Sequence, residues 1–194
     1  MPRKNRGYKK GKPYKDSRLF VIACEGKTEV PYFEALVGHS QRLKVILLPP
    51  KDDNLSAPKW VRNRAATYIE EFPLKGKDDE LWFIMDVDRW KKEVLIEIIK
   101  DCQENEKWFI GLSNPCFEVW LYAHLNDLNN LKIETCKEIK KMLKKNYSPT
   151  LFAQKHVDQA IKYSIAKETD PNSDFPFKYE TKLHLLAQKI LSFR

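Results

Sequence analysis

The stretch LWFIMDVD, residues 81–88, decides the fold, because five apolar residues lead directly into two aspartates. A continuous apolar run of this length is typical of a strand buried on both faces, as in a parallel sheet. Aspartate is disfavoured in strands, so Asp86 and Asp88 mark the end of this one. Their spacing of two residues directs both carboxylates to the same side of an extended backbone. Hard divalent cations prefer such oxygens, and the alternative is a pair of solvated aspartates in a loop.

Segments of strand and helix character alternate around this stretch. We expect strands at residues 18–24, 43–48, 81–86 and 108–112, with helices at 27–36, 58–72 and 91–105 between them. This order predicts an α/β fold with a parallel four-stranded sheet flanked by helices. Helices are also expected at 116–125, 134–146, 157–167 and 179–193. The predicted organisation is a basic disordered tail (1–17), an α/β core (18–126) and a C-terminal helical addition packed on it (127–194).

The ends of the predicted strands carry polar and acidic residues. Glu25 follows the first strand, Asp86 and Asp88 end the third, and Asn114 follows the fourth. Asn114 precedes a proline, a pair that predicts a helix N-cap and places Glu118 in the first helical turn. Ligands of parallel sheets bind at the carboxyl ends of the strands, so a metal site is predicted at this rim. The alternative for Glu118 is simple interaction with the helix dipole.

The net charge of +8 is concentrated at the N-terminus, where residues 1–15 hold seven Lys or Arg and no Asp or Glu. Glycines and prolines disfavour regular structure there, so the segment is predicted to be disordered when free. A tail of this charge is suited to the phosphate backbone of nucleic acid. The predicted contacts are Arg3, Lys4, Arg6, Lys9, Lys10 and Lys12. The alternative is a solubilising tail. The basic segment 134–146 is open to the same two interpretations.

Several classes of protein are disfavoured by the sequence. No apolar run approaches the roughly 20 residues of a membrane span, and no signal peptide is visible, which predicts a cytoplasmic protein without membrane contact. The glycine needed upstream of Gly26-Lys27-Thr28 for a P-loop is replaced by Val21. The cysteines are predicted to be reduced and mostly buried: Cys24, Cys102, Cys116 and Cys136.

Two motifs resemble known families. CEGKTE (24–29) followed by DVD (86–88) resembles the Toprim catalytic core shared by topoisomerases, primases and OLD-family nucleases. SNPCFEVWLYAH (113–124) resembles more specifically the RloB family, and the likeness extends from about residue 18 to the C-terminus. The resemblance implies a Toprim-like sheet with a helical addition, Mg2+ or Mn2+ as cofactor, and a partner ATPase of the ABC or OLD type.

The resemblance also assigns roles to residues. The implied catalytic residues are Glu25, Asp86, Asp88 and Glu118, and the implied metal ligands are Glu25, Glu29, Asp86 and Asp88. Behind them, contact with substrate or support of the ligands is implied for Lys27, Asn114 and His124, although a histidine beside Trp120 is more often a core residue. OLD-type sites also use a late lysine, for which the candidates are Lys155, Lys167 and Lys178.

These roles predict a metal-dependent nuclease. Hydrolysis of a phosphodiester needs a nucleophilic water and a stabilised leaving oxygen, which two divalent ions can provide, and Glu25 could instead be a general base. The expected substrate is RNA, with tRNA a candidate, or DNA. The resemblance implies the role of an effector in phage defence or abortive infection under a partner's control. The alternatives are a non-catalytic nucleic-acid-binding or adaptor module of a defence or restriction complex, and a phosphoryl or nucleotidyl transferase.

Overall fold

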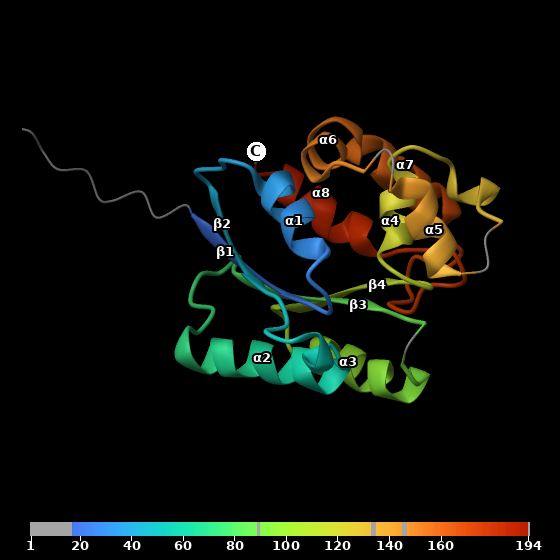
Figure 1. Ribbon diagram of the computed structural model, residues 1–194. Helices are drawn as coiled ribbons and strands as arrows, with labels where there is room; N and C mark the ends of the chain where they lie inside the picture. Colours follow the sequence, from blue (N-terminus) through green and yellow to red (C-terminus); the bar gives the residue numbers. More distant parts are fainter. Residues whose placement is uncertain (1–16, 89, 133–134, 145–146, 194) are drawn as a thin grey trace, which may run out of the picture.

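The computed structural model describes residues 17–88, 90–132, 135–144 and 147–193 (Figure 1). Its strands form one parallel sheet in the order β2-β1-β3-β4. Their bounds are β1 Arg18–Cys24, β2 Leu43–Leu48, β3 Glu80–Asp86 and β4 Trp108–Ser113. All four predicted strands are present within one residue of their expected ends. The predicted α/β fold with a four-stranded parallel sheet is therefore confirmed.

Helices cover both faces of this sheet. Helices α2 (Pro58–Glu71) and α3 (Lys92–Glu104) lie on one face, and α1 (Glu29–Val37) lies on the other (Figure 1). The face with α1 also carries all the later helices, which are α4 (Glu118–Ala123), α5 (Cys136–Leu143), α6 (Pro149–Leu151), α7 (Val157–Lys167) and α8 (Leu183–Leu191). Short 3-10 turns occur at Asp53–Leu55 and Leu128–Asn130, and a π-helical segment at Phe152–His156 continues α6 into α7.

The alternating side chains of the central strands build two apolar cores. Ile22 and Trp82 point to the face of α1 and the C-terminal helices, whereas Val21 and Phe83 point to α2 and α3. All four are at most 2% exposed, as the continuous apolar runs of β1 and β3 predict for strands buried on both faces. Helices α5 to α8 contribute to the first of these cores and thus pack directly on α1, α4 and the sheet. The division of the chain after residue 126, into an α/β core and a C-terminal helical addition, stays a prediction.

The order of the strands creates a switch point between β1 and β3. From β1 the chain passes through α1 on one face to β2, and from β3 it passes through α3 on the other face to β4. The loops that leave the two strands therefore turn away from each other and open a crevice at their carboxyl ends. Glu25 and Asp86 lie at these two strand ends.

One helix prediction needs correction, and one helical segment was not predicted. Asn114 is not an N-cap: α4 begins four residues later, at Glu118. The polar groups of Asn114 are used elsewhere, because its side chain donates to the carbonyl of Pro176 (3.0 Å) and its carbonyl accepts from the backbone N of Tyr179 (2.7 Å). The helical segment from Pro149 to His156 was not predicted, although Ser148 caps it and a proline opens it.

Within the described residues, no helix is both long and apolar enough to cross a membrane.

Candidate functional site

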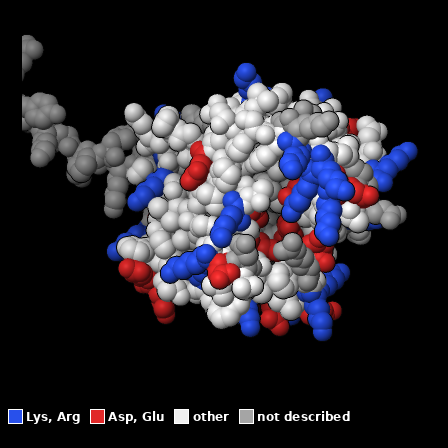
Figure 2. All heavy atoms as spheres, viewed as in Figure 1, with Lys and Arg blue, Asp and Glu red and all other residues white. Residues whose placement is uncertain are grey.

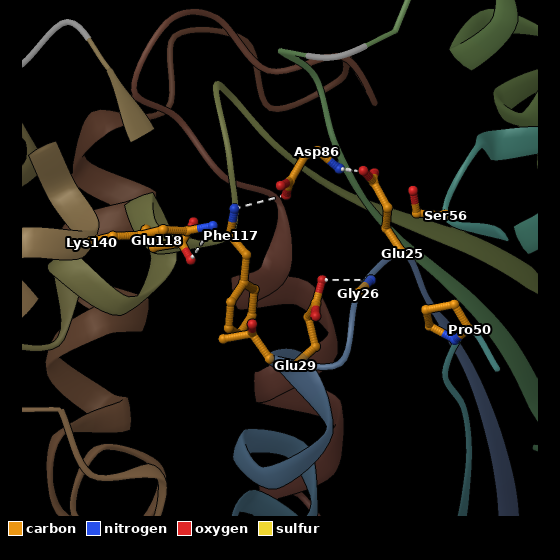
Figure 3. A pocket seen from close by; sticks show the side chains of 10 residues that line it. Glu25, Gly26, Glu29, Pro50, Ser56, Asp86, Phe117, Glu118 and Lys140 are labelled. Carbon is orange, nitrogen blue, oxygen red and sulfur yellow. Dashed lines mark hydrogen bonds and ion pairs between the residues drawn. The ribbon is translucent and has the colours of Figure 1, made fainter. Parts of the chain in front are cut away.

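A pocket of about 300 Å³ opens at the switch point between β1 and β3 (Figure 3). Its lining comes from the β1–α1 turn, the connection from β2 to α2, the end of β3, the start of α4 and the exposed side of α5. The lining residues are Glu25, Gly26, Thr28, Glu29, Pro50, Ser56, Asp86, Phe117, Glu118 and Lys140. The four carboxylates among them come from three separate segments of the chain. The pocket is therefore an acidic site assembled by the fold.

Two of the carboxylates link the neighbouring segments to one another. Glu25 is 3% exposed, and its Oε2 atom accepts a hydrogen bond from the backbone N of Asp86 at 2.9 Å. Asp86 in turn accepts a hydrogen bond at Oδ1 from the backbone N of Phe117 at 2.8 Å. These bonds connect the end of β1 with the end of β3, and the end of β3 with the start of α4. The positions of both carboxylates are thereby fixed.

Glu29 is a buried acid of the pocket, only 4% exposed. Its Oε1 atom accepts a hydrogen bond from the backbone N of Gly26 at 3.3 Å, while Oε2 is buried without a partner among the described residues. A Cβ atom at position 26 would lie 3.0 Å from Oε2, so the glycine leaves the space that the carboxylate occupies. Burial, and then the charges of Glu25 and Glu118, raise the pKa of Glu29 to about 7.

Glu118 and Lys140 close the pocket on the side of the C-terminal helices. The Nζ atom of Lys140, on α5, lies 3.3 Å from Oε1 of Glu118, in the first turn of α4. The side chain of Glu118 is 6% exposed and that of Lys140 is 52% exposed. Of the described residues that line the pocket, Lys140 is the only one with a positive charge. The lysine can therefore move from Glu118 toward an anionic ligand without a large change in its own burial.

The carboxylates outnumber the positive charges in this pocket. The pKa of Asp86 is raised well above its usual value, chiefly by burial and then by the charges of Glu25, Glu29 and Glu118. Like charges that are held this close oppose one another's ionisation. The pocket is thus electrostatically suited to take up a cation or a proton.

The donor set fits a hard divalent cation in its chemistry. Mg2+ and Mn2+ prefer carboxylate oxygens, and the buried Oε2 atom of Glu29 has no other partner among the described residues. Within that same part of the chain, no three His, Cys, Asp or Glu side chains already lie close enough together to coordinate one ion. The residues that would hold the ion are those that line the pocket, Glu25, Glu29, Asp86 and Glu118.

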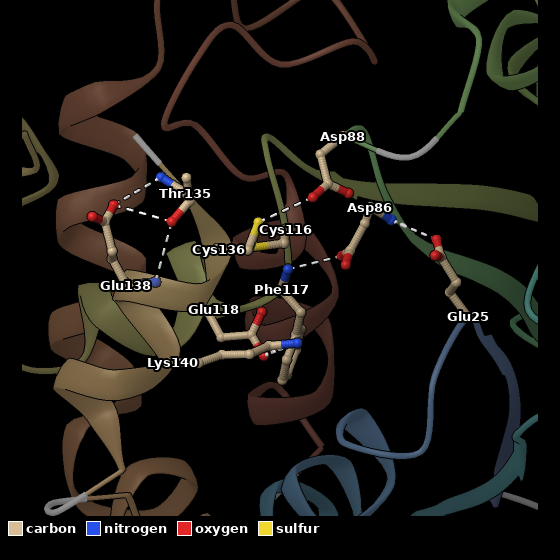
Figure 4. Close-up of a disulfide and its surroundings, with 10 residues drawn as sticks. All are labelled: Glu25, Asp86, Asp88, Cys116, Phe117, Glu118, Thr135, Cys136, Glu138 and Lys140. Atoms are coloured by element: carbon tan, nitrogen blue, oxygen red, sulfur yellow. Dashed lines mark hydrogen bonds and ion pairs between the residues drawn. A yellow bond between two sulfur atoms is a disulfide. The ribbon is translucent and has the colours of Figure 1, made fainter. Parts of the chain in front are cut away.

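Two residues predicted at the site lie outside the pocket lining. Asp88 is exposed, and its Oδ2 atom lies 3.1 Å from the Sγ atom of Cys136, on the far side of Asp86 from Glu25 (Figure 4). The sulfur belongs to a disulfide and has no proton to donate, so this is a contact and not a hydrogen bond. Lys27 is exposed on the β1–α1 turn and does not line the pocket.

Asn114 and His124 also lie away from the pocket. Asn114 is bonded to residues 176–180, as described above. His124 is 1% exposed and is a core histidine: its Nε2 atom lies 3.0 Å from Oη of Tyr32, and Nδ1 lies 2.9 Å from the carbonyl oxygen of Trp120. Burial lowers its pKa to about 4. Tyr32 belongs to the same helix as Glu29, so His124 joins α1 to α4 behind the site.

The prediction that all four cysteines are reduced is wrong. Cys116 and Cys136 form a disulfide with a Cα–Cα distance of 6.3 Å (Figure 4), whereas Cys24 and Cys102 are free and buried. The bridge joins the residue before Phe117 to the first residue of α5. It thereby holds the helix of Lys140 beside the start of α4, a long-range contact that the spacing of the cysteines did not indicate.

Lys140 is the site residue that the sequence analysis missed. None of the late lysines considered there, Lys155, Lys167 and Lys178, lines the pocket. The basic character of segment 134–146 was the signal that could have found it. The predicted tail contacts Arg3, Lys4, Arg6, Lys9, Lys10 and Lys12 lie outside the described residues.

Comparison with known proteins agrees with the likeness seen in residues 113–124. The family described as RloB-like protein matches residues 20–190. This range includes all lining residues of the pocket and all four strands, except for the first two residues of β1. No curated protein and no solved structure matches the chain. On the match over residues 20–190, the chain belongs to the family of RloB-like proteins.

Proposed function

We propose that this RloB-like protein is a metal-dependent nuclease of the Toprim type, which hydrolyses phosphodiester bonds of RNA or DNA with Mg2+ or Mn2+. The observation that carries the proposal is the pocket at the switch point, where four carboxylates face one lysine. Acids at the ends of the first and third strands, Glu25 and Asp86, agree with the arrangement that the Toprim resemblance implies. Asp88 lies outside the pocket lining, so we assign the ligands to Glu25, Glu29, Asp86 and Glu118.

The residues of the pocket have complementary tasks in this reaction. The carboxylates would hold the cation at the strand ends. When bound, divalent ions supply an activated water and stabilise the charge on the leaving oxygen. Lys140 contributes a positive charge that moves from Glu118 to the oxygens of the phosphate as negative charge develops there. The hydroxyl groups of Thr28 and Ser56 line the same pocket and can donate hydrogen bonds to the phosphate.

The biological role follows from the resemblance, and we propose it on that ground. The nuclease would be an effector of phage defence or abortive infection, with tRNA among its candidate substrates. A partner ATPase of the ABC or OLD type would control its activity. Such control is compatible with ligands that are brought to one pocket but are not yet close enough together to bind one ion.

The test is incubation of the purified protein with labelled tRNA, single-stranded DNA and duplex DNA, in Mn2+ and in chelator. We expect cleavage that requires the metal and is lost in Asp86→Asn and Lys140→Ala. A Lys155→Ala variant is the matched control, because Lys155 does not line the pocket. Cleavage that persists in chelator, or in both pocket variants, would exclude this site as its origin.

A non-catalytic nucleic-acid-binding or adaptor module is the second candidate. It is favoured by the Lys140–Glu118 ion pair, which neutralises one carboxylate, and by the separation of the carboxylates within the described chain. Tight binding of nucleic acid without cleavage, in the presence of the partner ATPase and Mn2+, would support this candidate over the nuclease.

A further inference from the structure

The lysines of α5 lie on one side of the helix. Lys137, Lys140, Lys141 and Lys144 follow the spacing i, i+3, i+4, i+7, which places four side chains on one face. We call this set the lysine face. Ile139 and Leu143 are buried on the opposite side, in the core shared with α1 and α4. The helix therefore packs through its apolar side and presents its charge outward.

This arrangement places like charges together on α5, although Lys140 and Lys141 stand in its last turn, where the helix dipole favours positive charge. Each lysine of the face has like charges three or four residues away, which repel one another. The helix is nevertheless retained, because Thr135 and Glu138 form a capping box at its start, Cys136 is bridged to Cys116, and the apolar side is buried. A concentrated positive face of this kind attracts polyanions and raises their local concentration.

The lysines of this face are accessible. All four are exposed, and only Lys140 has an ion-pair partner among the described residues, Glu118. Figure 2 shows the positive side chains gathered over α5, directly beside the hollow where the acidic side chains of the pocket are visible. Lys140 belongs both to the lysine face and to the lining of the pocket. The positive surface is thus continuous with the entrance of the acidic site.

We propose that the lysine face of α5 binds the phosphate backbone of a nucleic-acid strand and directs it to the pocket. This inference rests on the proposed function and adds the path of the substrate. Seven residues separate Lys137 from Lys144, which is about 10 Å along a helix. A face of this length can contact more than one phosphate of the same strand. Its contacts carry no base specificity, because they reach only the phosphates.

The test compares two triple variants of equal charge. The first is Lys137→Gln/Lys141→Gln/Lys144→Gln, which leaves Lys140 in the pocket. The control is Lys75→Gln/Lys77→Gln/Lys100→Gln, three exposed lysines on the loop before β3 and on α3. Binding of a labelled single-stranded oligonucleotide is measured by anisotropy between 50 and 200 mM salt, in chelator so that no cleavage occurs.

We expect the first variant to lose roughly tenfold or more in affinity and about two to three units in the slope of log K against log salt. The control variant should behave as the wild type. Replacement of the same three lysines by arginine should restore binding, because arginine also contacts phosphate. In Mn2+, hydrolysis of bis(p-nitrophenyl) phosphate should be unchanged in the first variant, because this small diester is too short to need the lysine face.

Three outcomes would overturn the inference. The first is equal slopes for the two triple variants, and the second is a wild type that does not bind the oligonucleotide. The third is loss of binding only to an acidic polypeptide, such as polyglutamate, which would assign the face to a protein partner. The proposed function fails separately. If the protein binds nucleic acid through the lysine face but hydrolyses neither substrate, the binding role of the face stands and the nuclease assignment is wrong.

Discussion

Asp86 combines two tasks that can be separated by one substitution. Its Oδ1 atom accepts the hydrogen bond from Phe117, and its charge adds to the repulsion within the pocket. Asparagine keeps an oxygen for the hydrogen bond and removes the charge. The pocket residues can therefore be tested for a binding role without dismantling the loop between β4 and α4.

We expect Asp86→Asn to abolish hydrolysis while the metal-free protein melts at the same temperature or higher, because one repelling charge is gone. Added Mg2+ or Mn2+ should stabilise the wild type by mass action, by about 2.7 kcal/mol at a hundred times Kd. The variant should lose most of this shift. Melting curves of both proteins with and without metal decide the matter. A variant that melts lower, beside a wild type that is indifferent to metal, would contradict the catalytic assignment of Asp86.

His124 predicts a pH dependence of stability. Its pKa is lowered to about 4 in the folded protein, mainly by burial and further by the nearby His156, against about 6.5 in the unfolded chain. The unfolded state then binds more protons, so the contribution of His124 is complete above pH 6.5 and is lost as the pH falls toward 4. The difference of 2.5 units corresponds to roughly 3 kcal/mol.

The measurement is urea unfolding of the wild type and His124→Asn between pH 4 and 7.5. Glu29, whose pKa is raised to about 7, acts in the opposite direction in both proteins, since its contribution is lost as the pH rises from 4.5 to 7. The comparison therefore isolates the histidine. We expect the wild type to be the more stable protein at pH 7.5 and to lose this advantage near pH 4. A difference that is constant with pH would show that His124 is not held neutral.

At the scale of elements, the strands and their ends could be predicted from the sequence. The apolar runs of β1 and β3, each followed by an acid, predicted that Glu25 and Asp86 meet at one rim, and the structure brings both to the same pocket. The position of Asp88 was not predicted, because side chains alternate between the two sides only within a strand, and β3 ends at Asp86. The basic segment 134–146 pointed to positive charge on α5, but the place of Lys140 in the pocket and the disulfide depend on how α5 packs on α4, which the sequence pattern does not give.

The Cys116–Cys136 bridge is expected to stabilise α5 in its place. It closes a loop with a sequence separation of 20 residues, which corresponds to about 3 kcal/mol from the restricted unfolded chain. We expect Cys116→Ser/Cys136→Ser to lower the free energy of unfolding by about this amount. The same loss should follow when a reductant is added to the wild type, and the double variant should not respond to the reductant. Equal denaturation midpoints for the oxidised and reduced wild type would refute a stabilising bridge.

At the scale of the whole molecule, positive charge is concentrated at the lysine face of α5 and at the N-terminus. The described chain carries the lysine face beside the acidic pocket, while residues 1–15 hold seven Lys or Arg and no acid. Deletion of residues 1–15 should leave the melting temperature unchanged, because this segment contains no apolar run that could contribute to a core. It should also weaken binding of nucleic acid and flatten its dependence on salt. Binding measurements on the truncated and full chains test this, and identical salt slopes would exclude contact between the tail and phosphate.

The packing of α8 on α1 and β4 also has a consequence for the time at which the protein becomes active. Translation adds roughly 5–20 residues per second, so α8 leaves the ribosome roughly ten to thirty seconds after Glu25 has been made. Until then α1, which carries Glu29, lacks part of the surface on which it packs. An emerging chain therefore holds the acidic residues before the core behind α1 is complete. On the proposed function, the nuclease gains the full support of its site only after synthesis of α8, which limits attack on the RNA of the ribosome that is making it.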